Sequence, residues 1–128
     1  MNGDPGRGAS RREDPGASRA AAAIGDVARI LAREGVAVWG ACPSQPMESE
    51  PPGRRPSDLL PGARSLLCFG LAVPRGIFGQ GRHVVESHWR TQGLHYRRLD
   101  GLSVRVAARL EEEGELAVPI FGCMPVET

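Results

Sequence analysis

The clearest pattern along the chain is an uninterrupted apolar run at residues 66–73, which follows the turn sequence LPGARS. An apolar run of this length predicts a β-strand that is buried on both faces. The stretch VAVWGA at residues 36–41 predicts an earlier strand, and residues 118–122 predict a third one.

Apolar residues at helical spacing predict a first helix over residues 19–34. Ser18 is expected to cap its amino end, and Gly35 is expected to terminate it. The side chains expected on its buried face are Ile24, Val27 and either Ile30 or Leu31.

A second, longer helix is predicted to begin near Val84 or Val85 and to continue to Gly114. Its interior glycines, Gly93 and Gly101, each weaken it by roughly 1 kcal/mol, so a break at either position is compatible with the pattern. The stripe expected to face the sheet consists of Val85, Trp89, Gln92, Tyr96, Leu99, Ser103, Val106 and Leu110.

Together these elements predict an α/β fold of order α-β-β-α-β, with a small three-stranded sheet and two helices. Residues 1–17 are rich in glycine, proline and mixed charge, so we expect them to be disordered. Residues 43–56 hold five prolines and are expected to form a loop. Because two helices hardly cover both faces of an apolar sheet, we expect residues 18–128 to form an incomplete domain.

Composition and charge narrow the classes of protein. No segment reaches the roughly 18–20 apolar residues of a membrane-spanning helix, and no signal-peptide core follows Met1, so a cytoplasmic protein is expected.

All 16 basic residues are arginine, and seven of them lie between residues 75 and 109, against only Glu86 and Asp100. Such an excess attracts phosphate groups or nucleic acid, but arginines that are spread around a helix without interleaved aromatic residues are better explained as a solvated helix face.

The three cysteines lie far apart and include no CxxC pair, which argues against a zinc ribbon or a disulfide framework. Cys68 is expected to be a small core residue. Cys42 and Cys123 each follow a predicted strand, where ligand-facing residues often lie in open α/β sheets, although an incidental placement remains an alternative. His88 and His95 are seven residues apart, too far for a helical metal site, so no metal ligands are expected.

The segment PRGIFGQGR at residues 74–82 lies between a predicted strand and a predicted helix, where phosphate groups often bind. Its glycines follow the order G-x-x-G-x-G, which differs from the dinucleotide fingerprint, and the chain has no Walker lysine. A loop that frames the edge of a cofactor and a purely structural loop both remain open.

The order of these segments resembles the N-terminal region of the epoxyqueuosine reductase family. The segments that carry the resemblance are LPGARS with the strand after it, the loop PRGIFGQGR, the helix that contains Tyr96 and ends in LEEEG, and then AVP. The resemblance covers roughly residues 20–126 and extends to iron-sulfur relatives that share features with reductive dehalogenases. It implies a cytoplasmic, cobalamin-dependent oxidoreductase of queuosine biosynthesis, a tRNA modification. Residues 18–128 would be the opening part of its cofactor-binding domain.

On this resemblance the chain supplies one wall of a cobalamin site and depends on a second chain or a missing C-terminal part. The contacts implied are Cys42, Gly76, Phe78, Gly79 and Cys123.

The family's glycine-rich GLGW-type segment and its two C-x-x-C-x-x-C-x-x-x-C-P motifs, which hold [4Fe-4S] clusters, are absent from this sequence. Its proposed proton donor, an aspartate shortly before a proline, aligns with Gly122 when Pro125 is matched to that proline. If that match fails, the aspartate is expected beyond the end of this sequence. We therefore expect no iron-sulfur ligands, no catalytic residue and little activity from this chain alone. The alternative is a non-enzymatic remnant or interaction module that pairs through an exposed sheet edge.

Overall fold

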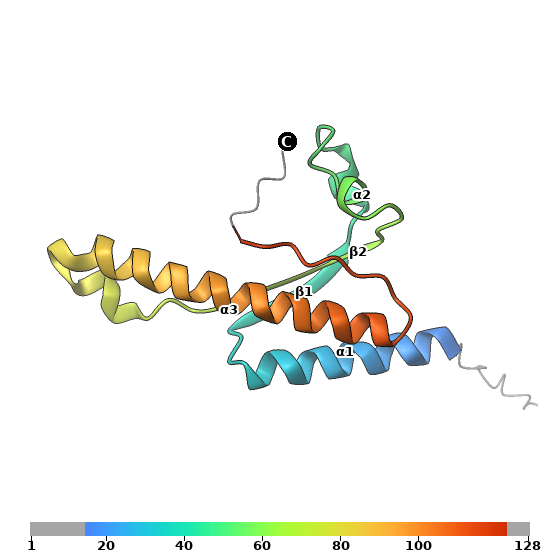
Figure 1. The fold of residues 1–128 in the computed structure, drawn as a ribbon, viewed down its shortest axis with the longest axis horizontal. Coiled ribbons are helices and arrows are strands. Elements are labelled where there is room, and N and C mark those ends of the chain that lie inside the picture. Colours follow the sequence, from blue (N-terminus) through green and yellow to red (C-terminus); the bar gives the residue numbers. More distant parts are fainter. Residues whose placement is uncertain (1–14, 123–128) are drawn as a thin grey trace, which may run out of the picture.

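The computed structural model describes residues 15–122, which form two long helices packed on one face of a two-stranded antiparallel sheet (Figure 1). The elements in chain order are α1 (Pro15–Arg33), β1 (Val38–Pro43), the 3-10 turn η1 (Gln45–Ser49), α2 (Pro56–Leu59), β2 (Ser65–Gly70), the 3-10 turns η2 (Arg75–Gly79) and η3 (Gly81–His83), and α3 (Val84–Glu112). Helices α1 and α3 lie side by side and run in opposite directions (Figure 1).

The predicted three-stranded sheet with two helices is wrong, because the described residues form two strands and three α-helices. Residues 118–122 form no strand. Pro119 has no N–H to donate to a strand ladder, and the segment instead returns to α3, where the N–H of Gly122 donates to Oδ1 of Asp100 at 2.9 Å. The additional helix, α2, starts at the end of the predicted loop. The carboxylate of Asp58 supports its first turn by accepting the N–H of Arg55 at 3.0 Å.

Helix α1 begins at Pro15, three residues before the predicted cap Ser18, so the prediction of a cap at Ser18 is wrong. Proline suits the first turn of a helix because its fixed φ is already helical and its missing N–H has no partner there. Residues 15–17, predicted to be disordered, are therefore helical, while residues 1–14 lie outside the described residues.

The predicted terminator of α1, Gly35, is confirmed. Its φ of 69° lies in the left-handed region that favours glycine. Its N–H donates to the carbonyl of Ala32 at 3.2 Å, and the N–H of Val36 donates to that of Leu31 at 3.1 Å. This pair of bonds is the Schellman motif, and Val36 completes it by packing against the core.

The core is a small cluster between α1, α3 and β2. Leu31 is fully buried, so the buried face of α1 includes Leu31, whereas Ile24 is 54% exposed and faces away. The buried residues of the cluster are Val27, Leu31, Leu102 and Val106, and its partly buried members are Ile30, Val36, Leu67, Phe69 and Leu110.

Helix α3 continues without a break through Gly93 and Gly101 and is about 44 Å long. Its first half projects beyond the end of α1 (Figure 1), so the predicted stripe is only partly correct. Val106 is buried, but Trp89 is 75% exposed instead of facing the sheet. We call residues 75–97, which comprise η2, η3 and the first half of α3, the arm. None of the helices described between residues 15 and 122 is long and apolar enough to span a bilayer.

Candidate functional site

The two faces of the sheet differ in what covers them. In the register of the two strands, Val38 lies opposite Gly70 and Pro43 opposite Ser65. Since side chains alternate along a strand, Leu67 and Phe69 point to one face, and they pack against the helical core. The other face, which we call the open face, carries Val38, Gly40 and Cys42 of β1 and Leu66, Cys68 and Gly70 of β2.

Most of the open face is exposed to solvent, while Leu66 and Gly70 are half-buried. Val38 is 69% exposed, and Cys42 and Cys68 are both exposed free thiols. The prediction that β2 is buried on both faces, with Cys68 in the core, is therefore wrong. An apolar run suggests a strand of a parallel sheet, whose crossover helices cover both faces. The two strands are instead antiparallel and need no crossover helix, and no helix of the described residues covers this face.

The sheet ends beside a shallow hollow of about 460 Å³ between β1, η1 and α2. Its polar groups bond to one another. The hydroxyl of Ser44 donates to the carbonyl of Ala63 at 2.9 Å, and the hydroxyl and N–H of Ser57 donate to the carboxylate of Glu48 at 2.6 and 3.0 Å. These hydrogen bonds connect η1 and α2 to the end of the sheet. Within the part of the chain that the structure describes, no buried polar side-chain atom of the hollow lacks a hydrogen-bond partner.

The predicted loop residues Gly76, Phe78 and Gly79 all lie in η2, on the arm. Phe78 is 62% exposed, and its ring lies 5.9 Å from the imidazole of His88 on α3 at a tilt of 48°. Among residues 15–122, no atom lies within 4 Å of the position where a Cβ of Gly76 or Gly79 would stand. The loop thus offers an open aromatic surface.

The structure does not bring the predicted site residues together. Cys42 lies on β1, which packs through β2 against the core near Leu102, and Leu102 lies about 27 Å along α3 from its start at Val84. Figure 1 shows η2 at the far end of the arm, well separated from the sheet. Cys123 lies outside the described residues. Cys42 and the η2 residues therefore do not fit a single corrinoid site.

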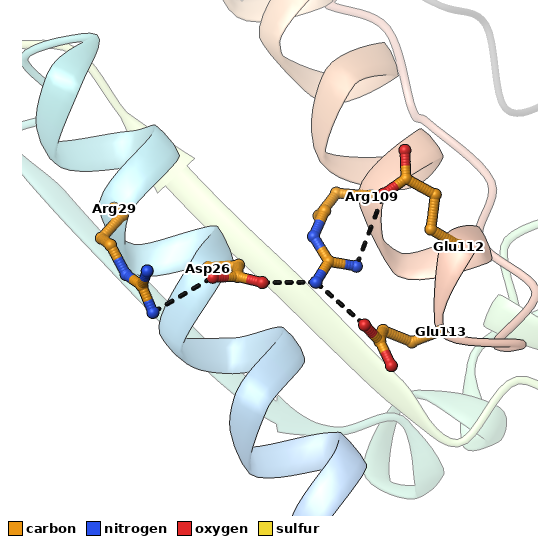
Figure 2. A network of polar contacts seen from close by, with 5 residues as sticks. All are labelled: Asp26, Arg29, Arg109, Glu112 and Glu113. Atoms are coloured by element: carbon orange, nitrogen blue, oxygen red, sulfur yellow. Dashed lines mark hydrogen bonds and ion pairs between the residues drawn. The ribbon is translucent and has the colours of Figure 1, made fainter.

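Ion pairs bind α1 to α3, as Figure 2 shows. Arg109 lies at the centre, with its guanidinium bonded to Asp26 of α1 and, at 2.9 Å, to Glu113. Arg29 pairs with Asp26 at 3.1 Å, and Glu112 with Arg109 at 3.6 Å. The hydrogen bond from Arg109 lowers the pKa of Asp26, and the hydrogen bonds to Asp26 and Glu113 raise the pKa of Arg109.

A second ion-pair group lies nearer the other end of α1. Glu34 pairs with Arg105 through its carboxylate, and Arg98 donates to the backbone carbonyl of Glu34. The prediction of a solvated arginine face did not identify these contacts. Their signal in the sequence is spacing. Asp26 on α1 and Glu34, directly after α1, are eight residues apart, about two helical turns, and Arg98, Arg105 and Arg109 fall on one side of α3. Both groups act as structural clamps between the helices.

The described part of the chain contains no large cluster of metal-binding side chains. Between residues 15 and 122, no group of three or more histidine, cysteine, aspartate or glutamate side chains is placed to hold a metal ion. Comparison of the chain with protein-family models, with curated proteins and with solved structures found no match.

Proposed function

We propose that this chain serves as an assembly module in which the free edge of β1 pairs with a β-strand of another polypeptide. The observation that carries the proposal is the exposure of all six residues of β1, at the margin of a sheet with only two strands in the described residues. Two strands alone form a marginal sheet, and an exposed strand edge is a template for further pairing.

The hydrogen-bond pattern identifies which backbone groups are available at this edge. The N–H of Ser44 donates to the carbonyl of Arg64 at 2.9 Å, so the inward-bonding residues of β1 alternate from this pair. Trp39 and Ala41 consequently direct their N–H and C=O groups outward. Pro43 occupies the next outward position and has no N–H, which limits pairing to the first part of the strand.

The partner strand that we propose is β1 of a second copy. Antiparallel pairing of a strand with its own copy about a two-fold axis satisfies the same donors and acceptors on both chains. The formal net charge of +1 produces little repulsion between copies. A dimer of this kind contains a four-stranded sheet with β1 strands at its centre.

Sedimentation equilibrium with a backbone variant tests this proposal. Ala41→Pro removes an outward N–H on each chain and so two hydrogen bonds per dimer, which should weaken the dimer about tenfold or more. Ala41→Val is the matched control, because it keeps the N–H and should dimerise like the native chain. A native chain that stays monomeric at millimolar concentration, or equal dimerisation by the two variants, would contradict the proposal.

A second candidate function follows from the exposed aromatic surface of the arm. The resemblance to epoxyqueuosine reductases implies a corrinoid wall, and the exposed Phe78 ring beside His88 is a suitable apolar contact for the edge of such a ligand. We propose that the η2 loop alone makes this contact, without Cys42. The resemblance also implies a cytoplasmic location, and the tRNA partner that it implies stays a prediction.

Titration with cob(II)alamin, followed by its visible spectrum, tests the second candidate. Since one loop buries little ligand surface, the expected dissociation constant is on the order of tens of micromolar or weaker. Phe78→Ala should weaken binding, whereas Cys42→Ala should leave it unchanged. The absence of any spectral change at millimolar ligand, or equal effects of the two substitutions, would exclude the η2 loop as the contact.

A further inference from the structure

The open face brings two thiols from different strands into one neighbourhood. Cys42 pairs with Leu66 and Cys68 pairs with Gly40, so the two cysteines stand diagonally across the two strands. Successive side chains of a strand point to opposite faces of the sheet, and residues directly opposite each other share a face. By this register Cys42 and Cys68 lie on the same face, and both are exposed to solvent. The sequence separates them by 26 positions, which is why spacing alone did not pair them.

The diagonal geometry suits a bridge through a third atom better than a direct disulfide. Diagonal Cα atoms in an antiparallel pair lie about 7–8 Å apart, while a disulfide requires about 4.4–6.8 Å. A metal–thiolate bond of about 2.3 Å on each side allows two sulfur atoms about 4.6 Å apart to share one ion. We propose that Cys42 and Cys68 form a two-thiolate site for a soft monovalent cation, Cu(I).

The choice of ion follows from the number of ligands. Structural zinc takes four ligands in a tetrahedron, and within residues 15–122 no third histidine, cysteine or carboxylate joins the pair. Cu(I) is held well by thiolates and accepts two of them in a linear arrangement.

Access for the ion is open as well. Among the described residues, no atom lies within 4 Å of the position where a Cβ of Gly40 would stand, so the space directly opposite Cys68 is open at that position. Binding replaces the two thiol protons: two neutral thiols and one Cu(I) give a bis-thiolate complex of charge −1 and release two protons, with no change in oxidation state. Pairing of β1 edges leaves this face uncovered, so the site does not depend on the proposed assembly.

Competition for Cu(I) against the chelator bicinchoninate, with the full chain under anaerobic reducing conditions, measures the site. The native chain should bind one Cu(I), and Cys42→Ser and Cys68→Ser should each lower the affinity about 100-fold or more, because loss of a ligand costs at least as much as loss of a group that only orients one. The Cys123→Ser variant is the matched control and should bind like the native chain. Since Cys42 and Cys68 are exposed, their serine variants should keep the native circular dichroism and urea midpoint.

Three results would overturn the assignment. They are native-like Cu(I) affinity in either Cys42→Ser or Cys68→Ser, loss of binding in Cys123→Ser, and X-ray absorption that shows more than two sulfur ligands per copper in the native chain.

Discussion

At the scale of single residues, burial separates two side chains that share one helix. Leu102 is 3% exposed in the core, whereas Trp89 is 75% exposed on the arm. Leu102→Ala should therefore lower the free energy of unfolding by about 2–5 kcal/mol, and Trp89→Ala by no more than roughly 0.5 kcal/mol. Urea denaturation of the two variants measures both values. A larger loss of unfolding free energy for Trp89→Ala would show that the arm packs against the rest of the fold.

The pH dependence of stability should report the clamp between Asp26 and Arg109. The hydrogen bond from Arg109 lowers the pKa of Asp26 below its ordinary value of 3.8. The contribution of this pair to stability is thus present above pH 3.8 and is lost as the pH falls through the lower, folded value.

Urea midpoints between about pH 6 and about pH 2 test this expectation. Arg109→Met should flatten the loss of stability below pH 3.8, whereas Arg90→Met should not, because the pair that Arg90 forms with Glu86 is exposed to solvent. Identical acid profiles for Arg109→Met and the native chain would show that the clamp does not couple to folding.

At the scale of elements, alanine substitution of Gly35, which follows α1, and of Gly101, inside α3, should have opposite effects on stability. Gly35 has a φ of 69°, so Gly35→Ala should destabilise the fold by roughly 1–2 kcal/mol. Gly101 is exposed inside α3, and no atom of the described part of the chain lies within 4 Å of the position where a Cβ would stand. Gly101→Ala should therefore stabilise the fold by about 1 kcal/mol. Thermal melts of the two variants should shift in opposite directions; a shift in the same direction would contradict the assigned helix ends.

The helices were predictable from sequence because their signals are local. The Gly35 terminator and the apolar spacing around Val106 both lie within the helices that they define or beside them. The strands were located within two or three residues, but their pairing was not predictable, since the apolar run at residues 66–73 does not encode the direction of its partner. The third strand was predicted incorrectly because the apolar run at residues 118–122 outweighed Pro119, which cannot donate a hydrogen bond to a strand ladder.

At the scale of the whole molecule, neither candidate surface follows from composition. The sequence pointed to Cys42 and Phe78 as parts of one site, but about 27 Å of α3 lies between its start beside η2 and the part of the core against which β2 packs. Cys68 was expected in the core and instead joins Cys42 on the open face, because antiparallel pairing leaves that face without helices among the described residues. On the proposed function, assembly of the chain depends on the strand with which the edge of β1 pairs.

Amide hydrogen exchange, measured residue by residue with NMR at low and high protein concentration, tests this central claim most directly. The N–H of Gly40 bonds within the sheet and should be protected at both concentrations, while the outward N–H of Ala41 should become protected only at high concentration. If Ala41 exchanges at the same rate at both concentrations while the chain remains folded, β1 does not pair with a second copy.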